Sequence, residues 1–174
     1  MRKIFLVIAT VILGSLIIFG LAKTSNISLP KKSPPPQITN IEPAVQIEGT
    51  NLYLAENGQV LDRASSKKPL LYLDKNIKVQ AGQKITDQQI LFAVKIATGL
   101  TKSDFTAASI RLLDSRDIAV YSPQDAIAVF SSDKDANLQI DSLQQVLAKA
   151  KIDATKISKI DLRFDKPVIV FKQQ

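Results

Sequence analysis

The feature that most constrains this chain is an uninterrupted apolar segment close to the N-terminus. Residues 4–22 read IFLVIATVILGSLIIFGLA, and none of these 19 residues is charged. As an α-helix, a segment of this length rises about 28 Å, close to the ~30 Å thickness of the hydrocarbon core of a bilayer. We therefore expect residues 1–22 to form a transmembrane anchor.

The same segment also has a feature of a cleaved secretion signal. Gly20-Leu21-Ala22 has the small-x-small form of a cleavage site, although the apolar core of such a signal usually has only about 7–15 residues. Length thus favours a retained anchor. Basic residues lie on both sides, Arg2 and Lys3 before the segment and Lys23 after it, so charge alone does not decide the orientation. The short N-terminal tail favours a single-pass protein of the cytoplasmic membrane, with its N-terminus in the cytoplasm and its C-terminal domain outside.

Residues 23–44 have the composition of a spacer. Five prolines stand among Ser, Lys and Asn residues: Pro30, Pro34, Pro35, Pro36 and Pro43. Consecutive prolines favour an extended polyproline II path, in which twenty residues reach about 60 Å. We expect a linker that holds a domain away from the bilayer. Binding of the prolines to an SH3-like partner is the alternative interpretation.

Several short segments after the linker have the pattern of β-strands. Asn57-Gly58 is a strong hairpin signal, because both residue types tolerate a positive φ. Alternation of apolar and polar residues, as around Arg111, is typical of a sheet with one solvated face. The expected strands are residues 52–55, 59–62, 70–73, 109–113, 117–121, 126–130, 160–164 and 168–171.

Two segments have the apolar spacing of amphipathic helices. The first is expected to begin at Thr86, which forms a capping box with Gln89, and to end at Gly99. The second is expected over residues 142–151, with a capping box that starts at Asp141. The connections are short and we expect no βαβ alternation. This order of elements predicts an α+β fold over residues 45–174, a mostly antiparallel β domain with two helices.

The composition argues against catalysis. The chain has no His and no Cys, which removes the commonest general base and metal ligand and any disulfide. Ser65 and Lys68 have the S-x-x-K spacing of penicillin-binding enzymes, but the companion motifs are missing. Asp133 and Asp135 could offer oxygen ligands to a cation, but a solvated turn is the simpler interpretation. We expect no enzyme activity, no cofactor, no metal site and no small-molecule substrate.

The net charge of +7 bears on the class of partner. Arg2 and Lys3 account for two of these charges, so the remainder of the chain carries +5. Acidic and basic residues alternate along the sequence, which argues against nucleic acid. A mildly basic domain suits an anionic membrane surface or wall polymer, or simply a solvated surface without a charged ligand.

The C-terminal sequence KISKIDLRFDKPVIVF resembles the end of the β domain of the FtsQ/DivIB cell-division family. That family's domain typically ends in a strand of the form [IV]-D-L-R-[FY], a tight turn and a final strand. The matching residues here run from Ile160 to Asp165. The hairpin after the linker, the helix, the three strands and the second helix follow in the same order, so the resemblance covers residues 52–171. The POTRA domain that normally precedes the β domain has no counterpart, because only the linker stands in its place.

The resemblance implies a bitopic scaffold that recruits small coiled-coil membrane proteins of the division machinery, similar to FtsB and FtsL. In the family, a partner segment adds as a strand beside the last strand of the β domain. By motif match, the partner-binding residues here are Arg163, Phe164, Val168, Ile169, Val170 and Phe171. Simpler roles stay open, namely a surface ion pair of Arg163 with Asp161 and a core position for Phe164 and Phe171. The alternative function is an anchored or secreted envelope-binding domain, for a wall polymer or pilus component, without a role in division.

Overall fold

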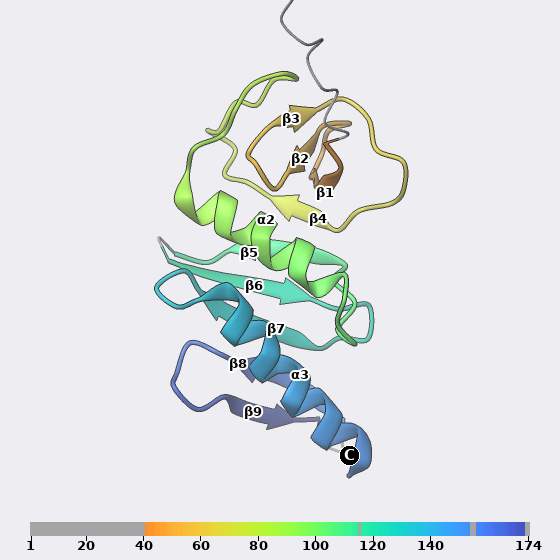
Figure 1. Ribbon diagram of the computed structural model, residues 1–174, viewed down its shortest axis with the longest axis vertical. Helices are drawn as coiled ribbons and strands as arrows, with labels where there is room; N and C mark the ends of the chain where they lie inside the picture. The colour runs from red at the N-terminus through yellow and green to blue at the C-terminus, as the bar shows by residue number, and fades with distance from the viewer. Residues whose placement is uncertain (1–40, 115, 154–155, 173–174) are drawn as a thin grey trace, which may run out of the picture. The chain divides into compact units, whose positions relative to one another are not determined.

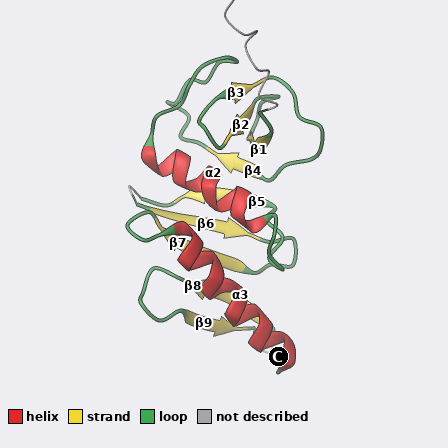
Figure 2. Cartoon of the chain, viewed as in Figure 1, coloured by secondary structure: helices red, strands yellow, loops and turns green. Residues whose placement is uncertain are grey.

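The computed structural model describes residues 41–114, 116–153 and 156–172 of the chain (Figures 1 and 2). The expected anchor, residues 1–22, and nearly all of the expected linker lie outside the described residues. None of the helices that are described is long and apolar enough to cross a membrane. The expected linker end at residue 44 is wrong, because Pro43 already begins the first strand, where its missing N–H is tolerated.

The described residues fold as an α+β domain around a nine-stranded, mostly antiparallel sheet, as the sequence predicts. The strands lie in the order β3-β2-β1-β4-β5-β6-β7-β8-β9. Their bounds are Pro43–Ile47 (β1), Tyr53–Ala55 (β2), Val60–Leu61 (β3), Leu70–Tyr72 (β4), Ser109–Leu112 (β5), Asp117–Tyr121 (β6), Ile127–Ser131 (β7), Ile157–Asp161 (β8) and Val168–Phe171 (β9). The expected antiparallel run β5-β6-β7 is confirmed.

The expectation of no βαβ connection is wrong. Helix α2 (Gln88–Leu100) connects β4 to its parallel neighbour β5, and helix α3 (Ala136–Ile152) connects β7 to its parallel neighbour β8. Hairpins leave local turn signals in a sequence, whereas a parallel pairing depends on contacts across a whole helix. Both helices lie on the same face of the sheet (Figure 1).

The core lies between these helices and the sheet. The strand register places one fully buried row straight across the sheet: Leu71, Ile110, Val120, Ala128 and Ile160. Ala93 and Val94 of α2 and Leu143 of α3 are equally buried and belong to the same core cluster. Each large apolar side chain buried in this way contributes about 1.5–3 kcal/mol.

Helix α2 begins and ends differently from the prediction. Its N-cap is Asp87, whose Oδ1 accepts a 2.9 Å hydrogen bond from the Ile90 N–H, and not Thr86. Gln89 forms no capping box and instead donates from Nε2 to the carbonyl oxygen of Asp117, at 2.9 Å. Gly99 does not end the helix, because it lies inside the last turn, where a Cβ would be 2.3 Å from Ile140 Cδ1 of α3. The glycine thus allows the two helices to approach closely.

Helix α3 begins six residues earlier than residue 142. Asp135 is its N-cap and accepts hydrogen bonds from Asn137 N–H and Leu138 N–H at 2.8 and 3.0 Å, whereas Asp141 lies inside the helix. The added turns bring the buried Gln139 beside the end of β7. Its amide accepts from Ser131 N–H at 2.9 Å and donates to Ser131 C=O at 2.8 Å, as a neighbouring strand would. This amide satisfies backbone groups that would otherwise be buried without partners.

The face of the sheet opposite the helices carries half-buried aromatic side chains. The strand register places all three tyrosines of the chain on this face: Tyr53, Tyr72 and Tyr121. The Arg111 guanidinium lies 4.9 Å from the ring centroid of Tyr72 and 5.3 Å from that of Tyr121. Such cation–π contacts hold the Arg111 guanidinium close to the two rings.

The hairpin β2–β3 confirms the Asn57-Gly58 turn signal. Gly58 has φ +84°, a left-handed conformation that favours glycine. The outer side of β3 is covered by the segment that follows β4. Val60 N–H donates to Gln83 C=O at 2.9 Å, and Ile85 N–H donates to Gly58 C=O at 2.8 Å. One edge of the sheet is therefore engaged by the chain itself.

Candidate functional site

The opposite edge of the sheet is formed by β9, which pairs with β8 alone among the described strands. The last strand thus lies at an edge of the sheet, which strand addition beside it requires. Lys172 N–H, just beyond the strand, donates to Lys156 C=O at 2.9 Å and so faces the β8 side. Because this direction alternates along a strand, the N–H and C=O groups of Ile169 and Phe171 face outward. An edge with such free groups can accept another strand.

The side chains of β9 lie on the two faces of the sheet. Ile169 and Phe171 are on the helix side and line a groove of about 320 Å³ against α3, where they meet Val146 and Ala150. We call this the edge groove. Val168 and Val170 are on the other face and are 50% and 48% exposed. None of the four side chains is fully buried, so neither pair of β9 belongs to the core.

Phe164 lies in the turn between β8 and β9. The expected strand over residues 160–164 is shifted, because β8 ends at Asp161. The Phe164 ring is 55% exposed and lines a second hollow, of about 580 Å³, together with Leu138 of α3. A core position for Phe164 or for the 51% exposed Phe171 is therefore wrong.

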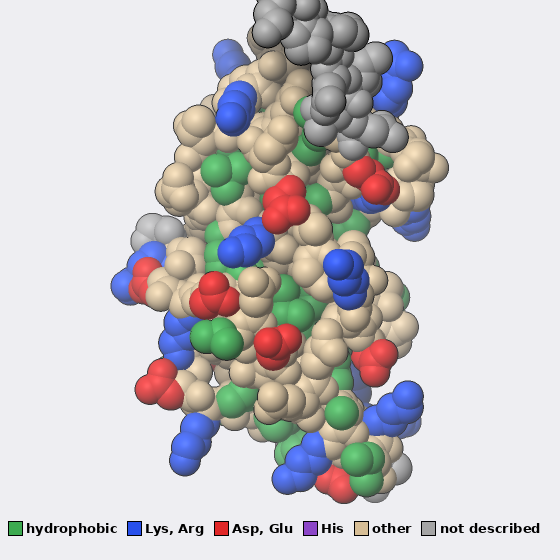
Figure 3. Space-filling model, in the orientation of Figure 1, with side chains coloured by type: hydrophobic (Ala, Val, Ile, Leu, Met, Phe, Trp, Pro, Cys, Tyr) green, Lys and Arg blue, Asp and Glu red, His purple; other side chains and the backbone are tan. Residues whose placement is uncertain are grey.

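Exposed apolar side chains concentrate around this edge. Eight large hydrophobic residues are exposed among the described residues, and four of them lie between residues 164 and 171. Figure 3 shows the helix-bearing face, where hydrophobic side chains lie between charged ones without forming one broad apolar patch. A narrow apolar strip beside a free strand edge suits an extended peptide better than a flat protein surface.

Arg163 is engaged inside the protein. Its Nε and Nη2 bind the two carboxylate oxygens of Asp161 at 2.8 and 2.7 Å, and its Nη1 binds Asp117 Oδ2 at 2.8 Å. The hydrogen bonds from Arg163 lower the pKa of Asp161, although burial of that carboxyl acts in the opposite direction. The pKa of Arg163 is raised in turn. The main cause is its hydrogen bonding to Asp161, and the second is its hydrogen bond to Asp117.

This network changes the interpretation of the IDLRF sequence. The Asp161 side chain is only 7% exposed, so the pair is not the surface ion pair that its spacing suggests. Arg163 also lies over the Phe164 ring, with its guanidinium carbon 5.8 Å from the centroid. Arg163 thus positions the turn that carries Phe164, and a direct contact of Arg163 with a partner stays a prediction.

The structure does not support a chemical role for the other candidate residues. Ser65 and Lys68 lie in a loop and not at a helix start, and Lys68 Nζ binds Glu42 at 3.1 Å. Asp133 pairs with Arg116 at 2.8 Å, whereas Asp135 caps α3. Within the described ranges, no group of three or more His, Cys, Asp or Glu residues is placed to hold a metal ion.

The structure places four of the six predicted partner-binding residues, 168–171, in the edge strand itself and Phe164 in the turn that leads to it. Arg163 lies in the same turn, and its side chain binds Asp161 and Asp117. Sequence reasoning missed the edge groove, the role of Asp117 and the amide of Gln139, since each depends on a contact across the fold. Compared with known proteins, the chain matches no protein-family model and no characterised sequence at a significant level.

Proposed function

We propose that this protein is a non-catalytic scaffold of the cell-division machinery, anchored in the cytoplasmic membrane by residues 1–22. In this proposal the α+β domain lies outside the cytoplasm and recruits small coiled-coil membrane proteins similar to FtsB and FtsL. The proposal rests on the apolar N-terminal segment and on the resemblance of residues 160–165 to the FtsQ/DivIB family. The free edge of β9 is the structural observation that supports it.

A partner segment would pair with β9 as a tenth strand. Its backbone would bond the outward N–H and C=O groups of Ile169 and Phe171, which gives affinity. Its side chains on the helix side would enter the edge groove beside Val146, which gives specificity. The other sheet edge is less suitable, because Gln83 and its neighbours already cover β3.

Replacing Ile169 with proline is expected to weaken partner capture at least about tenfold, because it removes one outward N–H and places a ring at the edge. The bond from Lys172 N–H to β8 involves a different position and is retained. The measurement is co-purification of full-length protein with co-expressed candidate partners. Ile169→Val is the matched control, since it keeps the N–H and a β-branched side chain. Equal capture by the proline and valine variants, with unchanged melting, would place the binding surface elsewhere.

Phe164→Ala is expected to weaken the same complex about 30-fold, which corresponds to roughly 2 kcal/mol for an aromatic interface anchor. Because the ring is 55% exposed, the melting temperature of the free protein should change little. Leu113→Ala is the control, since Leu113 is 51% exposed and precedes β6, far along the sheet from β9. Similar losses for both variants would contradict a specific role for Phe164.

The division role is tested separately from strand addition. A fluorescent fusion of the full-length protein is expected to gather at the division septum, and Ile169→Pro is expected to prevent recruitment of the partner but not membrane attachment. A uniform distribution around the envelope, together with binding of a wall-polymer fragment, would support the alternative of an envelope-binding domain instead.

A further inference from the structure

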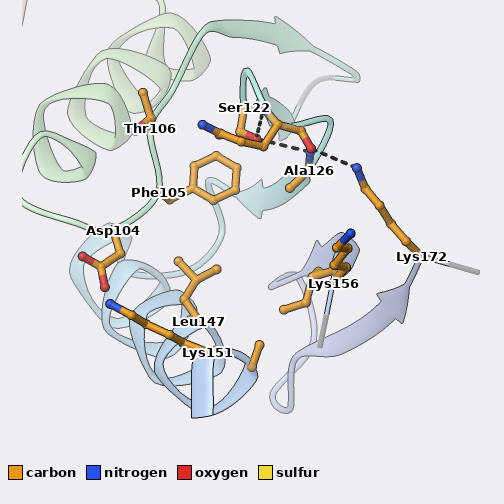
Figure 4. Close-up of a pocket in the computed structure, with 12 residues that line it drawn as sticks. Asp104, Phe105, Thr106, Ser122, Ala126, Leu147, Lys151, Lys156 and Lys172 are labelled. Atoms are coloured by element: carbon orange, nitrogen blue, oxygen red, sulfur yellow. Dashed lines mark hydrogen bonds between the residues drawn. The ribbon is translucent and has the colours of Figure 1, made fainter. Parts of the chain in front are cut away.

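A third hollow lies near the end of α3, and Figure 4 shows the residues that line it. Its volume is about 550 Å³, within the usual range of roughly 300–1,000 Å³ for sites that bind small molecules. The side chains come from the segment before β5, the turn between β6 and β7, helix α3, and the outer ends of β8 and β9. We call it the lysine pocket after three residues on its rim: Lys151, Lys156 and Lys172.

The floor of the lysine pocket is apolar. Phe105, only 3% exposed, belongs to the hydrophobic core, and Leu147 and Ile157 are partly buried and pack against that core. Figure 4 shows the Phe105 ring and the Leu147 side chain lying between Asp104 on one side and Lys156 on the other. A ligand in this pocket would therefore place an apolar part against the floor and a polar part at the rim.

The rim is cationic. The lining contains three ammonium groups, from the end of α3 and the outer ends of β8 and β9, and one carboxylate, that of Asp104. Lys172 Nζ donates to Gln124 C=O at 2.9 Å and lies 3.9 Å from Asp125 Oδ2, in a weak ion pair. Lys151 lies in the last turn of α3, where a positive charge is favourable. Lys156 has no such role among the described residues, and neither Lys151 nor Lys156 forms an ion pair with a described carboxylate. Like charges around one hollow repel each other, and a bound anion would relieve that repulsion.

A hydroxyl donor also lies in the lining. Ser122 Oγ accepts hydrogen bonds from Gln124 N–H and Ala126 N–H at 3.1 and 3.2 Å, and the residue is only 9% exposed. These bonds use the oxygen lone pairs and leave the hydroxyl proton to be donated, with no acceptor among the described residues. A proton donor and three ammonium groups together suit a ligand with several acceptor oxygens.

We infer that the lysine pocket binds a phosphate group carried on an apolar chain, which is the chemistry of an acidic phospholipid. Lys156 and Lys172 would bind the phosphate oxygens by charge-assisted hydrogen bonds, and Lys151 would add its charge from the Asp104 side of the hollow (Figure 4). The chain would cover Phe105 and Leu147. A neutral sugar would leave the ammonium groups unpaired, and a small soluble phosphate would leave the floor exposed to water. This binding does not depend on the protein partner proposed for β9.

The test uses the full-length protein in a non-ionic detergent and measures the protection of lysines from acylation by mass spectrometry. The probe is dihexanoyl phosphatidylglycerol. It is expected to protect Lys151, Lys156 and Lys172, while the exposed Lys95 of α2 reacts at an unchanged rate. Two control compounds are expected to protect these lysines much less. Dihexanoyl phosphatidylcholine has the same chains but no net charge, and glycerol phosphate has no chains.

Variants provide the second arm of the test. The double change Lys151→Gln and Lys156→Gln is expected to raise the concentration for half-protection of Lys172 about tenfold or more, from the loss of charge-assisted bonds. Lys95→Gln removes one exposed charge elsewhere and should leave that concentration unchanged. Equal protection by glycerol phosphate would overturn the assignment of an amphiphilic ligand. Absence of protection, or protection that the double change does not weaken, would overturn the pocket as an anion site.

Discussion

Gly58→Ala is expected to lower the free energy of unfolding by about 3 kcal/mol or more, from backbone strain together with a steric clash. Gly58 has φ +84°, and a Cβ built there lies 2.3 Å from the carbonyl oxygen of Ile85. The backbone cannot move away easily, because Ile85 N–H donates to Gly58 C=O at 2.8 Å. The substitution therefore strains the turn and also loosens the segment that covers β3.

The measurement is urea unfolding of a fragment spanning residues 41–174, followed by circular dichroism. Gly49→Ala provides the matched control, since Gly49 has a similar φ of +72° but no atom within 4 Å of its Cβ position. That change should cost only the strain of the left-handed conformation, roughly 1–2 kcal/mol. If the two variants lost equal stability, the contact with Ile85 would have no energetic role.

Arg163→Met is expected to lower the free energy of unfolding by about 3 kcal/mol at neutral pH, because it leaves a buried carboxylate without its main partner. Asp161 would keep only Lys159 Nζ and the backbone N–H of residue 163, both at 3.3 Å, and Asp117 would lose its bond with Arg163. Methionine retains part of the apolar stem, so the loss reports mainly on charge. Arg116→Met tests the same change in an exposed pair, whose 2.8 Å bond to Asp133 should contribute at most about 1 kcal/mol.

The cost of Arg163→Met should also depend on pH. The folded protein holds the pKa of Asp161 below its ordinary value of 3.8. A lowered carboxyl pKa stabilises the fold above the unfolded pKa, and this contribution is lost as the pH falls through the folded pKa. The difference between the wild-type protein and the variant should thus be steady at neutral pH and shrink in acid. A difference that stays constant into acid would show that Arg163 acts through packing and not through charge.

Local signals in the sequence predicted most of the strands and the class of fold. Alternation placed β5, β6 and β7 within a residue or two, and the Asn57-Gly58 pair identified the first hairpin. These signals are short-range, because a turn or an alternating strand shows its preference within about six residues. Both helices were expected, yet α3 begins at Ala136, since Asp135 offers the same capping oxygen as Asp141 and lies at the start of the buried face.

Features that depend on distant contacts could not be predicted in the same way. The positions of Asp161 and Arg163 could be read from the IDLRF motif, but not the bond of Arg163 to Asp117, which lies 46 residues earlier. The edge groove needs the packing of α3 beside β9, and the lysine pocket needs five separate segments. Gly99 is a further example. Its local sequence resembles a helix end, whereas its close contact with Ile140 depends on how the two helices pack.

The strand order has a consequence for how the domain is assembled. From β4 to β9 the strands lie side by side in the order in which they are synthesised, and β1 to β3 form a small meander at the other end. Most pairings therefore join neighbours along the chain, which shortens the loops that must close and favours rapid folding. Each new segment can add to an already formed edge while the chain emerges, N-terminal part first. Among the described strands, β9 is the last to be synthesised, so the edge that forms last is also the one that no described strand covers.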